Sequence, residues 1–226
     1  MTARKRSLTG KVAVLVISDT HTGSSIGLAP PLVHLDDGGI YHSSDAQRLV
    51  YEHWQGVWKR TLALGLPVVV IDNADTVEGF HHNTAQIWGT DPRKHIDVAV
   101  DLRMPYRNRV ERWYALRGTV AHVGASGSGD EAVAKEIGAD ASNGTFSHYH
   151  LKVEISGVLF DITHHGISAG KPVLANTIWH ILIPFCNLIG YFVKFVISKV
   201  AVPSKPASKK PAQCIFIPIL PIELLP

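Results

Sequence analysis

The chain has 226 residues, 46% of them hydrophobic, which favours one sizeable core with an appendage over two full domains. Its formal charge of +3 is unevenly distributed, because residues 1–170 hold 18 of the 19 acidic residues while the last 56 residues hold six lysines and one acid. Both cysteines, Cys186 and Cys214, lie in that basic C-terminal part. This placement excludes a disulfide framework and a thiolate metal site in the first 170 residues.

Apolar runs of strand length predict buried strands over Lys11–Ile17, Pro67–Ile71 and Trp113–Leu116. A long loop is expected over residues 22–43, which are rich in glycine, serine and proline. Helices are predicted over residues 45–64, with Ser44 as the N-cap, and over residues 91–109 and 130–138. Alternating segments over His148–Ile155 and Val158–Thr163 predict a hairpin. The alternation of strands and helices indicates an α/β architecture.

Acidic and histidine side chains follow the predicted strands where these end. In chain order they are Asp19 and His21, then Asp75, then His122, and finally His164 and His165. A single Asp-x-His sequence is weak evidence, since it is more often part of a hydrogen-bonded turn. Four strand ends that carry such groups favour a site for hard divalent metals, which bind oxygen and imidazole ligands held rigidly by a sheet.

The ordered set resembles the calcineurin-like metallophosphoesterase superfamily, in particular its phage-associated members. Residues 19–31 are similar to that group's first motif, residues 75–86 to its second, and residues 117–124 to its variant of the Gly-Asn-His motif. The resemblance covers about residues 11–170 and implies a metallophosphoesterase domain over residues 1–170. The implied fold is a β-sandwich flanked by helices in four αββα layers, incomplete at its C-terminal end, with two metals at the strand ends.

The resemblance implies a role for each matching residue. Asp19 and His21 would bind the first metal and Asp75 would bridge both metals. His165, or its neighbour His164, would bind the second. Two divalent ions about 3.5–4 Å apart repel each other, and a shared carboxylate offsets this repulsion. Mn²⁺ is the first expectation for such oxygen and imidazole ligands, with Fe, Zn²⁺, Mg²⁺ and Ni²⁺ as alternatives.

Two positions depart from the family's pattern. Thr119 stands where the family has an asparagine metal ligand, and His122 follows three residues later as the implied proton donor to the leaving group. Ala74 replaces the glycine that usually precedes the bridging aspartate, although glycine adopts backbone conformations that alanine does not tolerate well. Candidates for contact with substrate phosphate follow the second motif: Glu78, His81 and His82. The simpler alternative for these three residues is a solvated loop.

Two further patterns have a structural and a functional interpretation. Arginines at positions 103, 107, 109 and 112 could face a phosphate backbone, although such a charge run is usually a solvated helix face. Trp54 and Trp58, four residues apart, are typical of core positions and less so of a base-stacking platform.

The composition changes beyond about residue 170, where eight of the 13 prolines occur and arginine is absent. The family's last motif, Gly-His-x-His, which supplies one histidine to each metal, does not occur there. Residues 178–202 are long and apolar enough for a membrane span, but lysines and a proline interrupt them. A peripheral amphipathic attachment is a second alternative. The preferred hypothesis for the tail, residues 171–226, is a shifted or truncated reading frame.

These observations lead to the expectation of a divalent-metal-dependent phosphoesterase that hydrolyses a phosphate mono- or diester with a two-metal-activated water. Nucleotides and nucleic acids are candidate substrates. A cytoplasmic location is expected because no secretory signal is evident. The alternative is a weakly active or inactive relative that binds nucleic acid or a protein partner, attached to a membrane through its tail or free of it. The missing last motif favours this alternative, since each metal would lose an imidazole.

Overall fold

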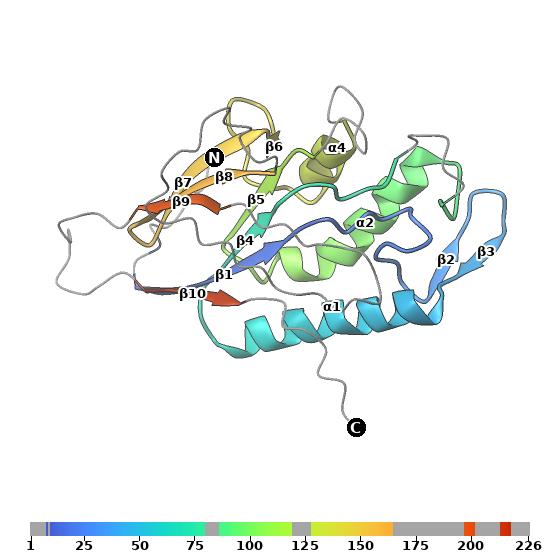
Figure 1. Ribbon diagram of the computed structural model, residues 1–226, viewed down its shortest axis with the longest axis horizontal. Helices are drawn as coiled ribbons and strands as arrows, with labels where there is room; N and C mark the ends of the chain where they lie inside the picture. Colours follow the sequence, from blue (N-terminus) through green and yellow to red (C-terminus); the bar gives the residue numbers. More distant parts are fainter. Residues whose placement is uncertain are drawn as a thin grey trace, which may run out of the picture.

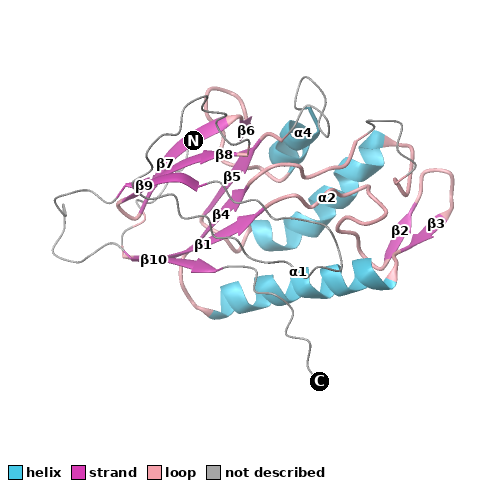
Figure 2. Ribbon diagram, viewed as in Figure 1, coloured by secondary structure: helices cyan, strands magenta, loops and turns pink. Residues whose placement is uncertain are grey.

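The computed structural model describes residues 8, 10–79, 86–118, 128–164, 197–201 and 213–217 (Figures 1 and 2). Three helices cover one face of a parallel sheet, and a smaller antiparallel sheet packs on the opposite face. The predicted α/β class is confirmed, and the described part has three layers. No second helical layer occurs in this part of the chain.

The parallel sheet has five strands in the order β10-β1-β4-β5-β6. Their bounds, in this order, are Gln213–Ile217, Lys11–Ile17, Val68–Asp72, Arg112–Leu116 and Ser147–His148. All neighbouring pairs are parallel. Because the strands are covered on both faces, β1 and β4 consist almost entirely of buried apolar residues, as their sequences predicted.

The helices begin where capping residues allow. Helix α1 spans Asp45–Ala63, and Ser44 forms a capping box with Gln47 that confirms the predicted start. Helix α2 spans Pro92–Arg107 after the N-cap Asp91, and α4 spans Ser128–Glu136. No helix in the described ranges is both long and apolar enough to cross a membrane.

Aromatic side chains fill the core between the helices and the parallel sheet. Trp58 is fully buried and stacks on Tyr106 of α2, with the ring centroids 4.2 Å apart, and on Trp113 of β5 at 5.7 Å. Trp54 is 7% exposed and packs edge-on against Trp58. Both tryptophans of α1 are therefore core residues, as their spacing predicted.

The second sheet is antiparallel and consists of β7 (His150–Ile155), β8 (Val158–Thr163) and β9 (Ile197–Ala201). Buried side chains of β7 and β8, Phe160 among them, pack against one face of β1 and β4. The predicted hairpin is confirmed, although His148 lies in β6 and not on its first strand. The predicted loop over residues 22–43 contains a small unpredicted hairpin, β2 (Leu32–His34) with β3 (Ile40–His42).

The four arginines at positions 103, 107, 109 and 112 lie on α2, after its end and in β5, and they do not form one solvated face. Arg103 is fully buried, and its Nε donates a hydrogen bond of 2.7 Å to Asp72 at the end of β4. Arg112 pairs with Asp140 at 3.2 Å, and Arg107 donates to the carbonyl oxygen of Gly138. Arg103 thus joins α2 to the parallel sheet, while Arg107 and Arg112 join α2 and β5 to the segment after α4. The interpretation as a solvated run holds only for the exposed Arg109.

The buried pair of Arg103 and Asp72 yields a stability prediction. Arg103→Met should lower the free energy of unfolding by about 3–5 kcal/mol, because it leaves the Asp72 carboxylate buried without its partner. Urea denaturation measures this change. Arg93→Met serves as the control, since Arg93 forms its ion pairs on the surface and its loss should change stability little. Equal effects of the two substitutions would contradict the prediction.

Candidate functional site

Two loops that leave the parallel sheet side by side form the centre of the site. They follow β1 and β4 from the same edge of the sheet (Figure 2). The backbone N–H of Asp19 donates to the carbonyl of Ala74 at 3.0 Å, and that of His21 donates to the carbonyl of Asp75 at 3.0 Å. The pairing of the two strands thus continues beyond their ends, so the first motif lies directly against the second.

Both loops have a strained backbone at the residues that the sequence singled out. Of the six described non-glycine residues with positive φ, four lie here: Asp19 (53°), His21 (44°), Ala74 (70°) and Asp75 (48°). Each left-handed residue of this kind costs roughly 1–2 kcal/mol. Strain concentrated in two adjacent loops is typical of functional sites, where the surrounding structure enforces it.

Three side chains from three strand ends converge at these loops. Ligand atoms of Asp19, Asp75 and His164 lie within 4.8 Å of one another. Asp75 follows β4 and is 3% exposed, and His164 follows β8 of the second sheet. Two carboxylates and an imidazole form a donor set that hard and borderline divalent ions accept. The sequence named Asp19 and Asp75, and it named His164 as the alternative to His165.

The hydrogen bonds of His164 determine which of its nitrogens faces the site. Its Nδ1 lies 2.7 Å from the carbonyl oxygen of Asn73, which can only accept, so Nδ1 carries a proton. Its Nε2 lies 2.9 Å from Oδ2 of Asp75. Burial lowers the pKa of His164, but the hydrogen bond and charge of Asp75 outweigh burial and raise the pKa to about 9. In the absence of a cation, His164 is therefore the charge partner of Asp75.

The His21 imidazole is held in a similar way by a carboxylate. Its Nδ1 lies 2.9 Å from Oε2 of Glu78, whose side chain is 12% exposed, and its Nε2 lies 3.9 Å from Oδ1 of Asp19. Burial lowers the pKa of His21, and the hydrogen bond and charge of Glu78 raise it above its ordinary value. Glu78 is thus an orienting partner of His21. The solvated-loop alternative is wrong for this residue.

Burial has the largest effect on the pKa of the Asp19 carboxyl. Burial raises the pKa of the Asp19 carboxyl, while a hydrogen bond from Ser18 and the charge of His164 lower it. A buried carboxylate with a raised pKa gains from a nearby cation. A divalent ion beside Asp19 would therefore lower the pKa of its carboxyl and stabilise the ionised form.

The structure also gives roles at the site to residues for which the sequence did not predict them. Asn73 contributes the carbonyl that orients His164, and Arg103 donates to the hydroxyl of Thr20 at 3.1 Å beneath the first loop. Asp130 binds backbone amides of the loops after β4 and β5. No local sequence signal marks these roles, because each partner is more than 50 residues away along the chain or acts through its backbone. Five predicted site residues lie outside the described ranges: His81, His82, Thr119, His122 and His165.

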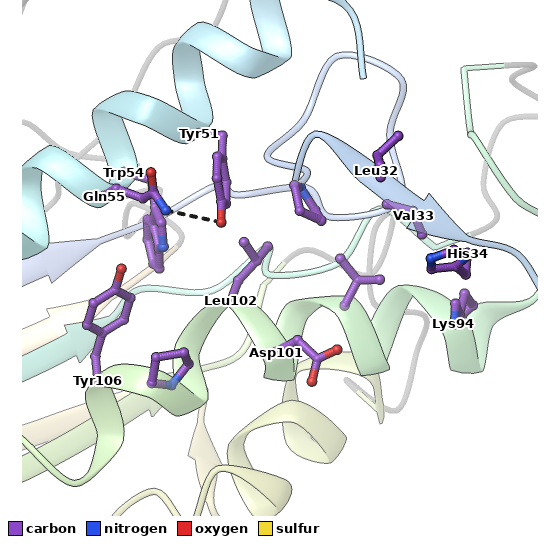
Figure 3. A pocket seen from close by; sticks show the side chains of 13 residues that line it. Leu32, Val33, His34, Tyr51, Trp54, Gln55, Lys94, Asp101, Leu102 and Tyr106 are labelled. Atoms are coloured by element: carbon purple, nitrogen blue, oxygen red, sulfur yellow. Dashed lines mark hydrogen bonds between the residues drawn. The ribbon is translucent and has the colours of Figure 1, made fainter. Parts of the chain in front are cut away.

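A groove of about 460 Å³ lies apart from this cluster, between α1, α2 and β2 (Figure 3). Trp54 and Leu102 line it from the two helices, and Tyr51 and Tyr106 project into it. Gln55 donates a hydrogen bond of 3.2 Å to the Tyr51 hydroxyl at its edge. None of the clustered acidic and histidine side chains lines this groove, so it is a separate feature of the helical face.

No protein-family model, curated protein or solved structure matches the chain. A functional assignment therefore depends on the donor groups of the site and on their geometry. The relevant observations are the convergence of Asp19, Asp75 and His164, the oriented imidazoles, and the strained paired loops that hold them.

The positive φ of Ala74 yields a prediction that compares two buried alanines. Ala74→Gly should destabilise the protein less than Ala13→Gly. The two losses in the free energy of unfolding should differ by about 1–2 kcal/mol, because only at residue 74 does glycine relieve a left-handed backbone. Ala74 is 1% and Ala13 is 0% exposed, so both substitutions remove a buried methyl group. Chemical denaturation of the two variants tests the difference. Equal losses of stability would show that the backbone at Ala74 is not strained.

Proposed function

We propose that the protein is a divalent-metal-dependent phosphoesterase of the calcineurin-like type, which hydrolyses a phosphate mono- or diester. The observation that supports this proposal is the group of Asp19, Asp75 and His164, whose ligand atoms lie within 4.8 Å of one another at the ends of three strands. The helical layer, parallel sheet and antiparallel sheet are compatible with the sandwich of that superfamily. In this proposal Asp75 is the ligand shared by two ions, and Mn²⁺ is the preferred metal.

The residues present fit a metal in three respects. The donor set contains oxygen and imidazole nitrogen, which suits Mn²⁺, Fe, Zn²⁺, Mg²⁺ and Ni²⁺. The Asn73 carbonyl fixes the Nδ1 proton of His164 and leaves Nε2 as the coordinating atom. Glu78 acts in the same way on His21 and leaves its Nε2 beside Asp19. Hydrogen bonds that orient ligating histidines in this manner are usual around protein metal sites.

Each part of the site contributes to the reaction through binding and orientation. A bound pair of divalent ions would polarise the phosphoryl group and lower the pKa of a water nucleophile. Asp19 and Asp75 supply the negative charge that attracts the ions, and the paired loops keep these carboxylates fixed during turnover. His122, outside the described residues, remains the proposed proton donor to the leaving group. Nucleotides and nucleic acids remain the proposed substrates.

A protein that binds metal and a partner without turnover is the second candidate. It is favoured by the absence of a Gly-His-x-His sequence after residue 170, which the complete site of the superfamily would use. Metal binding without detectable hydrolysis of nucleotides, nucleic acid and a generic phosphodiester would support this candidate over the enzyme.

Replacement of the bridging carboxylate tests the proposed enzyme. Asp75→Asn should abolish Mn²⁺-dependent hydrolysis of bis(4-nitrophenyl) phosphate, because an amide lacks the charge that two cations share. Metal analysis of the purified protein should show a lower content in this variant. Asp161→Asn, in β8 and paired with Lys152, is the matched control and should retain activity. Unchanged activity of the Asp75 variant would exclude the dinuclear mechanism.

The raised pKa of His164 predicts that protons compete with metal. The pKa of His164 is about 9 in the metal-free protein, so the imidazole is protonated at pH values below this. It must lose that proton to become a ligand. The affinity for Mn²⁺ should therefore rise with pH between 6.5 and 8, by up to about tenfold per pH unit. Calorimetric titrations in buffers of different ionisation enthalpy measure both the affinity and the released proton. An affinity independent of pH over this range would rule out His164 as a ligand.

A further inference from the structure

The side chain of Asp130 connects two loops of the site through their backbones. It lies in the first turn of α4 and is 2% exposed. Its Oδ1 accepts a hydrogen bond of 3.0 Å from the N–H of Thr76, and its Oδ2 accepts one of 2.8 Å from the N–H of Gly118. One buried carboxylate thus joins the loop after β4 to the loop after β5.

The position of Gly118 is in turn tied to the Asp75 side chain. A Cβ atom on Gly118 would lie 1.8 Å from Oδ1 of Asp75, closer than two unbonded atoms can approach. The Asp75 carboxylate therefore occupies the space that the missing side chain leaves. A movement of the Gly118 loop toward the site would displace this carboxylate, and a movement away would remove its support.

We propose that Asp130 is a positioning residue, which fixes the Asp75 carboxylate by holding the loop that carries Asp75 at a set separation from the loop that carries Gly118. This inference rests on the proposed function in one respect, namely that Asp75 is a metal ligand. Asp130 itself lies behind the loops and binds the backbone amides of both, with a further hydrogen bond to the Thr76 side chain. Its effect on metal binding would be exerted through Thr76 and Gly118.

A carboxylate is required for this task, and an amide does not replace it. Both oxygens of an ionised aspartate accept hydrogen bonds, whereas asparagine has one accepting oxygen and an NH₂ group that donates. In an Asp130→Asn variant the NH₂ group would face one of the two backbone N–H groups, so that one loop would lose its anchor. Burial raises the pKa of Asp130 to about 6, against the effect of the two amide hydrogen bonds. The carboxylate is therefore ionised at pH 8.

The neighbouring acid on α4, Glu131, also contacts the loop after β5, because it pairs at 3.2 Å with Arg117, next to Gly118. Glu131 is therefore not a control for Asp130. A control lies at the far end of β5, where Asp140 accepts a hydrogen bond of 2.8 Å from the N–H of Trp113. Asp140 is 7% exposed, so it resembles Asp130 in burial and in binding a backbone amide.

The test is a titration of the full chain with Mn²⁺ at pH 8, followed by calorimetry. Asp130→Asn should weaken Mn²⁺ binding about 10- to 100-fold, as is usual for residues that orient metal ligands from behind. Asp140→Asn should lower thermal stability and keep the affinity of the unsubstituted protein. Hydrogen exchange of the metal-free Asp130 variant should be faster over residues 73–79 and 117–118, and unchanged around Trp113.

Four results would overturn the inference. If Asp130→Asn binds Mn²⁺ as tightly as the unsubstituted protein, or if the Asp140 variant loses as much affinity, Asp130 has only a structural role. If the Asp130 variant does not fold, Gly118→Ala replaces it, and normal Mn²⁺ affinity of that variant would show that Gly118 does not position Asp75. If the unsubstituted protein binds no Mn²⁺, the proposed function fails together with the inference. A failure limited to the variants leaves the proposed function intact.

Discussion

The parallel pairing of β1 with β4, and its continuation into the loops beyond them, is the constraint on which the site depends. The register pairs Ile17 with Asp72, and backbone hydrogen bonds beyond this pair join Asn73 to Ile17, Asp19 to Ala74 and His21 to Asp75. A slip of this register would separate the two motifs and change which side chains face each other. β1 also pairs with β10, and β4 also pairs with β5, so both strands are held on their two edges. They can therefore enforce the left-handed conformations that the loop residues would not adopt alone.

Buried charges beneath the loops serve this geometry at a cost in desolvation. The Asp72 carboxylate lies at the end of β4 and is paired with the fully buried Arg103, which reaches the loop after β1 through Thr20. The Asp130 carboxylate has no cationic partner among the contacts of the described residues and is stabilised by two backbone amides and the Thr76 side chain. Buried ion pairs add little to stability relative to apolar residues, but they have a defined geometry. Their arrangement here fixes the directions in which the loops leave the sheet.

Much of the fold could be predicted because the relevant signals are local. Buried parallel strands appear as continuous apolar runs, and the start of α1 follows from Ser44 and Gln47 at the spacing of a capping box. The hairpin of β2 and β3 was missed, since its strands are three residues long and carry no clear alternation. The burial of Arg103 was missed for another reason, namely that its partner Asp72 is 31 positions away. Local patterns do not encode such a pairing.

For the site, the sequence by itself determined the residue types and their order at the strand ends, because parallel strands place their carboxyl ends at one edge of a sheet. It could not distinguish His164 from His165, since adjacent histidines are equivalent until a fold places them. Only the tertiary structure brought His164 of the second sheet to Asn73 and Asp75, and Asp130 to the loops that it joins. These contacts depend on how two sheets and a helix pack together. Such packing is set by the whole core and not by any short segment.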